Sequence, residues 1–148
     1  MPTIDSNYAP KADTTKPVIV PVDVAANTLY PLSVMPVSFK IKESRGLESV
    51  KIYLDDKEVE YVAEGETYTF VIPSSGDERT VKVVAVDKAG NEASMKIENV
   101  IVSDSFFVRF INDTTYMITT IVTVIVVILA AFGLFVLIKK IIKYRKGV

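Results

Sequence analysis

The side chains with the most chemistry to offer in this sequence are carboxylates, and they gather in two places. Asp55, Asp56 and Glu58 lie at one predicted bend. Asp77 and Glu78 precede a predicted strand. Clustered carboxylates can bind calcium, which prefers hard oxygen ligands, but acidic residues also populate solvated turns and no EF-hand spacing is present. We therefore expect plain turns, no bound metal and no change of melting temperature when calcium is added.

A second polar set, Asp87, Gly90 and Asn91, stands in the segment Asp-Lys-Ala-Gly-Asn between two predicted strands. Asp and Asn side chains hydrogen-bond to nearby backbone groups and so organise turns. Glycine adopts a positive φ angle without the steric cost of a Cβ atom. The sequence therefore predicts a hairpin turn shaped by these three residues, with no ion needed to explain them.

Two residue types that many hydrolytic enzymes use are missing, because the sequence has no histidine and no cysteine. Their absence excludes Ser-His-Asp and Cys-His catalysis and the usual zinc sites. Glycoside hydrolysis needs only two carboxyl groups, but these must stand about 5–9.5 Å apart across a cleft. A small sandwich has little room for such a cleft. We expect a protein that is not an enzyme and uses no cofactor.

The longest apolar stretch, residues 114–138, contains no charged residue. Its centre, 117–138, has 22 residues. A helix of that length spans about 33 Å, enough for a hydrocarbon layer of about 30 Å. A buried core helix or strand is the alternative, but the run is apolar on all sides and ends abruptly in lysines. Because a single segment in lipid satisfies its own backbone only as a helix, we predict a transmembrane helix at 117–138.

Basic residues follow this run directly, and residues 139–148 contain no acidic residue. The basic side chains are Lys139, Lys140, Lys143, Arg145 and Lys146. The flank before the run, 103–116, has Arg109 as its one basic residue. By the positive-inside rule the tail then lies in the cytoplasm and the N-terminal domain outside the cell. We expect a single-pass protein of the cell membrane, with the lipid bilayer as a partner.

The chain before the apolar run is mildly acidic and begins with a polar, proline-containing segment. Residues 1–113 carry 12 basic and 18 acidic side chains, a net charge of −6, which offers no footprint for nucleic acid. No apolar signal peptide opens the sequence, so we expect a piece of a longer precursor whose upstream domains are further partners; the alternative is a complete protein inserted by another route. The expected organisation is a linker at 1–16, a β-domain at 17–103, a juxtamembrane segment at 104–116, the span, and a basic cytoplasmic tail at 139–148.

Short alternating segments separated by turn residues fill the region 17–103. We predict seven strands, at 18–22, 34–42, 49–54, 58–63, 67–72, 80–86 and 93–102, with no helix between them. Such a pattern is typical of an all-β sandwich in which each sheet buries one face. The predicted core consists of Val37, Phe39, Ile41, Val50, Ile52, Leu54, Phe70, Ile72, Val81, Val83 and Ala85.

The region from Asp13 to Val102 resembles bacterial Ig-like domains that occur in tandem on large surface proteins. The residues that carry the resemblance are Asp-Thr-Thr-Lys-Pro-Val-Ile at 13–19, Val-Lys-Ile-Tyr-Leu-Asp-Asp-Lys-Glu-Val at 50–59, and Val-Val-Ala-Val-Asp-Lys-Ala-Gly-Asn-Glu at 83–92. The resemblance implies an Ig-like sandwich that serves as a stalk, spacer or adhesive module. Wall-anchored relatives carry a Leu-Pro-x-Thr-Gly sorting signal, which this sequence lacks, so the helix itself is the expected anchor.

These observations lead us to expect a non-catalytic, membrane-anchored Ig-like module of a bacterial surface protein, acting as membrane-proximal spacer and anchor. The alternative is an adhesive module that binds a glycan or protein ligand, with exposed tyrosines such as Tyr53, Tyr61 and Tyr68 as its contacts. A signalling receptor is a third class. Its tail of about ten residues has no room for a folded output domain, so signalling would need a partner.

Overall fold

The structure is a computed structural model that describes residues 12–147. It divides into two compact units with the boundary between Ser103 and Asp104, and each unit is described here by itself. Most of the linker predicted at 1–16 lies outside the described residues, and residues 12–16 form neither helix nor strand.

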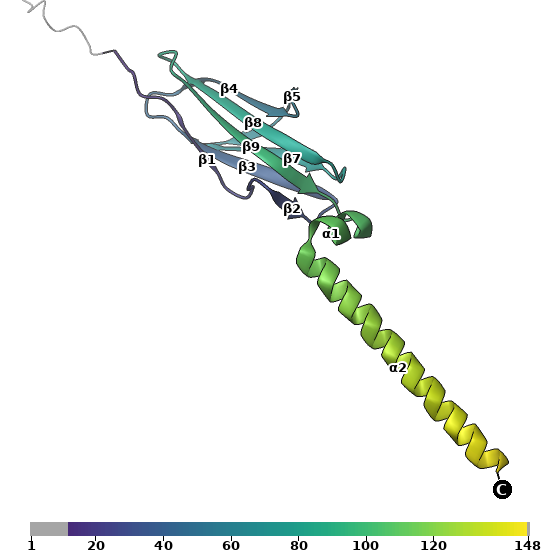
Figure 1. Cartoon of the computed structure of the whole chain (residues 1–148). Helices are drawn as coiled ribbons and strands as arrows, with labels where there is room; N and C mark the ends of the chain where they lie inside the picture. Colours follow the sequence, from purple (N-terminus) through teal and green to yellow (C-terminus); the bar gives the residue numbers. More distant parts are fainter. Residues whose placement is uncertain (1–11, 148) are drawn as a thin grey trace, which may run out of the picture. The chain divides into compact units, whose positions relative to one another are not determined.

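The first unit consists of two β-sheets (Figure 1). One sheet has four strands in the order β1 (Val18–Pro21), β3 (Val34–Lys42), β7 (Thr67–Pro73) and β6 (Val62–Glu64). The other has five in the order β2 (Thr28–Tyr30), β9 (Glu92–Val102), β8 (Glu78–Asp87), β4 (Leu47–Leu54) and β5 (Lys57–Val59). Neighbouring strands are antiparallel except β2 and β9, which are parallel.

This strand order is that of an immunoglobulin-type sandwich. If β2 and β5 are left out and the other seven strands are lettered A to G along the chain, β1, β3, β7 and β6 form the ABED sheet, and β4, β8 and β9 form the CFG sheet. The two remaining strands, β5 and β2, extend the second sheet at its two edges. The all-β prediction and its two-sheet arrangement are therefore confirmed.

Alternation along the strands builds the core between the sheets. In β3, Met35, Val37, Phe39 and Ile41 are buried while the residues between them are exposed or half-buried. Ten of the eleven predicted core residues are buried, and the eleventh, Val50, is half-buried and packs against the core. Six further apolar residues complete the core: Ile19, Val24, Met35, Ile97, Val100 and Val102.

Two predictions about the strands were wrong. The strand predicted at 58–63 is divided into β5 and β6, which belong to different sheets, so the chain changes sheet at Glu60 and Tyr61. The short strand β2 was not predicted. It forms because its three residues pair with Val100, Ile101 and Val102 near the end of β9. The sequence around residues 28–30 gives no signal of this pairing. The described residues contain nine strands instead of seven.

The second unit is helical. It contains a short helix α1 (Phe106–Asn112) and a long helix α2 (Thr114–Lys146). In Figure 1, α2 is one continuous helix and α1 is a separate short helix before it. Asp113 separates them, and its side chain caps α2 by accepting a hydrogen bond from the Tyr116 backbone N–H (3.0 Å). The segment 104–116, predicted as the juxtamembrane segment, contains α1 and the first three residues of α2.

Candidate functional site

Three acidic side chains from separate parts of the chain meet at one end of the sandwich. Asp13 precedes β1, Glu43 follows β3 directly, and Asp87 is the last residue of β8. A backbone hydrogen bond from the Lys88 N–H to the Gly46 carbonyl (3.2 Å) joins the β8–β9 hairpin of Asp87 to the β3–β4 loop of Glu43. We call these three residues the acidic cluster.

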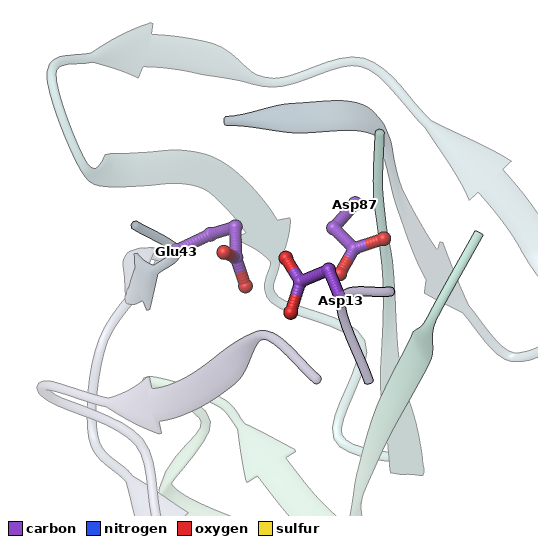
Figure 2. A group of neighbouring side chains, drawn as sticks. All are labelled: Asp13, Glu43 and Asp87. Atoms are coloured by element: carbon purple, nitrogen blue, oxygen red, sulfur yellow. The ribbon is translucent and has the colours of Figure 1, made fainter. Parts of the chain in front are cut away.

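The acidic cluster is compact. Each residue offers one carboxylate oxygen, and these three oxygens all lie within 4.8 Å of one another. Figure 2 shows the three side chains next to one another, with Asp13 between the other two. Taken as whole residues, Asp87 is buried, whereas Asp13 and Glu43 are half-buried. The side chain of Asp13 alone is almost fully buried. Like charges at such separations repel, and burial strengthens the repulsion.

The Asp87 carboxylate is fixed by the hairpin turn that joins β8 to β9. Its Oδ1 accepts hydrogen bonds from the backbone N–H groups of Ala89 and Asn91, both at 2.8 Å. Its Oδ2 accepts one from the Asn91 side-chain amide, also at 2.8 Å. The Asn91 side-chain hydrogen bond, helped by the backbone N–H groups, lowers the pKa of Asp87 although burial opposes this. Asp87 is therefore held in its ionised form.

Gly90 and Asn91 complete this turn. Gly90 has a φ angle of 87°, in the left-handed region, and its N–H donates to the Asp87 carbonyl (3.1 Å). The Asn91 side-chain amide also donates to the Asp13 carbonyl (3.2 Å). Asn91 thus connects the hairpin to the segment that carries Asp13. Asp87, Gly90 and Asn91 lie together in one turn, at the place where the sequence analysis expected them.

Asp13 and Glu43 each use one carboxylate oxygen in a local turn. The Asp13 Oδ1 accepts from the Thr15 N–H (3.1 Å), and the Glu43 Oε1 accepts from the Arg45 N–H (3.0 Å). The second Asp13 oxygen, Oδ2, is buried and accepts no hydrogen bond from any described residue. The Arg45 Nε atom lies 3.3 Å from it as an ion pair. The Arg45 guanidinium is therefore paired with one of the three carboxylates.

The acidic pairs that stand out in the sequence do not meet in this way. Asp55 forms an ion pair with Arg79 and accepts a hydrogen bond from the Thr80 N–H (2.8 Å). Glu58 forms an exposed ion pair with Lys51, with 3.7 Å between Nζ and Oε2. These contacts explain Asp55 and Glu58 as parts of the β4–β5 hairpin and its neighbours. Among the described residues, the acidic cluster is the group whose geometry fits a metal ion.

Two of the tyrosines proposed as ligand contacts pack within the sandwich instead. The rings of Tyr61 and Tyr68 meet edge to face, with 5.5 Å between centroids, and both pack against the core. The Tyr61 hydroxyl donates to the Val50 carbonyl (3.1 Å). Burial, followed by the nearby Tyr61, raises the pKa of Tyr68. Tyr53 is half-buried on β4, with the Lys82 ammonium 5.9 Å from its ring centroid. The three tyrosines therefore form no open aromatic platform.

The second unit has its own distinctive surface. Among the described residues, one helix, Thr114–Arg145, is long and apolar enough to cross a membrane by length and composition. Its apolar side chains are exposed on all sides. Lys139, Lys140, Lys143 and Arg145 lie on its last turns and are exposed.

Comparison with known proteins yields structural likeness only. No protein-family model matches the chain, and no curated protein matches it. Among solved structures, the fibronectin(III)-like modules of Clostridium thermocellum CbhA are 12% identical, with a TM-score of 0.47, covering 58% of this chain and 97% of that one. A modular endo-β-1,4-mannanase from Cellulomonas fimi is 16% identical, with a TM-score of 0.42, covering 59% of this chain. This chain spans 18% of the mannanase's length. At these values the matches assign the chain to no family.

Proposed function

We propose that this protein is a non-catalytic, membrane-anchored Ig-like module of a bacterial surface protein, which holds other domains near the membrane as a spacer and anchor. The observation that carries the proposal is the contrast within the chain between a closed sandwich core and a helix whose large apolar side chains are exposed from Ile118 onward.

The exposed surface of α2 supports the anchor. A soluble protein rarely exposes a large apolar surface without a partner, and along α2 large apolar side chains are exposed from Ile118 to Tyr144. Lipid covers all sides of such a helix at once, whereas a single protein groove covers one face. The polar backbone is satisfied within the helix, as a hydrocarbon layer requires.

The start of the helical unit supports an interfacial position for α1. Phe106 stacks on Phe110, with 5.8 Å between ring centroids, and meets Tyr116 edge to face at 6.0 Å. The Arg109 guanidinium lies over the Tyr116 ring, 4.2 Å from its centroid. Aromatic rings and an arginine directly before an apolar run are typical of the boundary between lipid and water. We place these residues at the outer headgroup level.

The charges after the apolar run support a cytoplasmic C-terminus. The cytoplasmic leaflet attracts each nearby Lys or Arg by about 1 kcal/mol, and the positive-inside rule counts such residues close to the span. The Lys139 ammonium lies 4.6 Å from the Phe135 ring centroid, so this lysine begins the basic end beside an aromatic side chain.

The sandwich supports a spacer more than an adhesive module. Tyr61 and Tyr68 pack against the core, so the contacts expected for a glycan are used by the fold itself. Asp55 and Asp56, which are adjacent in the sequence, sit in a tight turn with φ angles of 50° and 63°. We infer no catalytic role for either set of side chains.

Protease protection in cells tests the proposal. The full chain is fused behind a secretion signal, with one epitope before Pro2 and another after Val148. Protease added to intact cells should remove the first epitope and leave the second intact until the membrane is permeabilised. Protection of the first epitope with loss of the second would reverse the orientation. Recovery of both epitopes in the soluble fraction after cell lysis would exclude the anchor.

A further inference from the structure

We propose that Asp13, Glu43 and Asp87 bind one calcium ion at the end of the sandwich where the β3–β4 loop and the β8–β9 hairpin meet the segment before β1. The proposal goes beyond the anchor function and stands on the sandwich alone. It differs from the sequence-based prediction of no bound metal. That prediction rests on acidic residues that are close together in the chain, whereas Asp13, Glu43 and Asp87 are far apart in it.

The state of the Asp13 side chain points to a ligand. Its side chain is 8% exposed, and its Oδ2 atom is buried with no hydrogen bond from the described residues. Buried carboxylate oxygens are normally hydrogen-bonded, because an unsatisfied charged group in the interior is costly. In Figure 2 Asp13 lies between Glu43 and Asp87, and one oxygen of each of the three carboxylates lies within 4.8 Å of the others. A cation between the three would satisfy this oxygen.

Each carboxylate of the acidic cluster is oriented by the turn in which it stands. In Asp13 and Glu43 one oxygen accepts a backbone N–H within the same turn. The Asp87 carboxylate accepts three hydrogen bonds from its hairpin. These bonds fix the carboxylate groups before an ion arrives, which reduces the entropy lost on binding.

The spacing of the oxygens fits calcium. Calcium binds oxygens at about 2.3–2.6 Å, so two ligands of one ion stand at most about 4.6–5.2 Å apart. The three oxygens of the acidic cluster lie within 4.8 Å of one another. Magnesium requires about 2.0–2.1 Å and near-ideal octahedral geometry, and it gives up its water reluctantly. Carboxylates from three separate segments suit the more adaptable calcium ion.

Arg45 offers the competing explanation for the cluster. Its Nε atom lies 3.3 Å from the Asp13 Oδ2, but its side chain is 63% exposed and donates no hydrogen bond to that oxygen. The three carboxylates and this guanidinium, when all are ionised, together carry a net charge of −2. A guanidinium in solvent compensates this charge poorly. A divalent ion would neutralise it fully.

Calcium bound here would connect three parts of the chain. Asp13 belongs to the segment that leads into the first strand, whereas Glu43 and Asp87 belong to the β3–β4 loop and the β8–β9 hairpin. An ion shared by the three would fasten the entrance of the chain to the folded sandwich. The sandwich would then resist unfolding more strongly when calcium is present.

Calcium titration of the full chain in detergent micelles tests the site. Isothermal titration calorimetry with calcium chloride should give one site per chain, with a dissociation constant of about 0.1–1 mM, the range of extracellular calcium modules. Asp13→Asn and Glu43→Gln each remove one charged ligand while keeping the local hydrogen-bond acceptor. Each should weaken binding by at least about tenfold, as expected for loss of a charged ligand. Asp77→Asn, on an exposed loop, is the matched control and should bind like the parent chain.

Arg45→Gln separates calcium from the guanidinium explanation. Removing a positive charge next to the site should leave calcium binding equal or tighter, and the melting temperature should rise on adding calcium in this variant as in the parent chain. The absence of binding at 10 mM calcium would overturn the proposal. Equal binding by Asp13→Asn, Glu43→Gln and the parent would also overturn it, as would magnesium binding as tight as calcium binding. Because none of these measurements depends on membrane insertion, the calcium site and the anchor can fail separately.

Discussion

Strand β8 and the centre of helix α2 are both rich in β-branched residues, but they adopt different secondary structures. Residues 81–86 read Val-Lys-Val-Val-Ala-Val, and residues 121–128 read Ile-Val-Thr-Val-Ile-Val-Val-Ile. Both are rich in β-branched residues, which favour strands in water. In β8, however, Lys82 and Val84 are turned away from the core while Val81, Val83 and Ala85 are buried.

The difference lies in what satisfies the backbone. The N–H and C=O groups of β8 pair with β4 and β9, and the strand needs one buried face to hold those neighbours. Helix α2 pairs its backbone internally and presents apolar side chains on every side. Propensity therefore does not decide the structure of either segment. The pattern of polar residues and the surroundings decide it.

The largest effect on stability is expected when a large core side chain is shortened to alanine. Phe39 is fully buried between the sheets, so Phe39→Ala should destabilise the sandwich by about 3–5 kcal/mol. Thermal melting of the full chain in micelles, followed by the β signal in circular dichroism, measures this loss. Phe132→Ala removes the same ring from the exposed surface of α2 and should leave that transition unchanged. If Phe132→Ala lowered it equally, the sandwich and helix would not be independent units.

A charge in the middle of α2 should have the next largest effect. Leu129 lies near the centre of the apolar run, and an arginine there costs about 2.5–3.5 kcal/mol for membrane insertion. Leu129→Arg should therefore shift the protein from the membrane fraction to the soluble or degraded fraction in cells. Val71→Arg, on the exposed face of β7, is the matched control. An unchanged membrane fraction for Leu129→Arg would mean that the helix is not inserted.

Much of the sandwich could be predicted because its signals are local. In β3 the alternation of Val37, Phe39 and Ile41 with Ser38 and Lys40 directly gives the buried face. Strand β2 could not be predicted in this way, because its three residues are ordered by parallel pairing with the distant strand β9. The change of sheet at Glu60 and Tyr61 is likewise set by the topology, since both sides of it look like one extended segment.

The same distinction explains the acidic cluster. Asp87, Gly90 and Asn91 stand within five residues of one another, so their turn could be predicted from spacing. Asp13 and Glu43 are far from Asp87 in the sequence and lie beside it only in the folded sandwich. Neither has an unusual neighbour in the sequence. The signal that singles them out is three-dimensional, namely a buried oxygen without a hydrogen bond and two carboxylates nearby.

A smaller effect is expected from the β8–β9 turn. Gly90 has a φ angle of 87°, and a Cβ atom added there would meet nothing within 4 Å. The penalty is therefore conformational, about 1–2 kcal/mol in the left-handed region. Gly90→Val should lower the stability of the sandwich by at least about that amount. Gly133→Val, in the middle of α2, should leave the sandwich transition unchanged. A neutral Gly90→Val would show that the turn adopts another conformation in solution.

The smallest effect is a change in the pH dependence of stability. An unperturbed aspartate has a pKa of 3.8, and the pKa of Asp87 is lowered from this value. The main cause is the hydrogen bond from the Asn91 side chain. A lowered pKa in the folded state means that ionised Asp87 stabilises the fold fully above about pH 4. This contribution is lost as the pH falls through the folded-state pKa. In Asn91→Ala the folded-state pKa should rise toward 3.8, so the contribution from Asp87 to the acid loss of stability becomes smaller.

Two measurements in calcium-free buffer check this. The chemical shift of the Asp87 carboxyl carbon, followed by NMR between pH 2 and 6, should titrate at a higher pH in Asn91→Ala than in the parent. The slope of melting temperature against pH below pH 4 should be shallower in the variant. Val59→Ala destabilises the sandwich through its partly buried contact with the core, away from this turn, and should keep the parent slope. An unchanged Asp87 titration in Asn91→Ala would show that the backbone N–H groups of the turn, and not the Asn91 side chain, hold this carboxylate ionised.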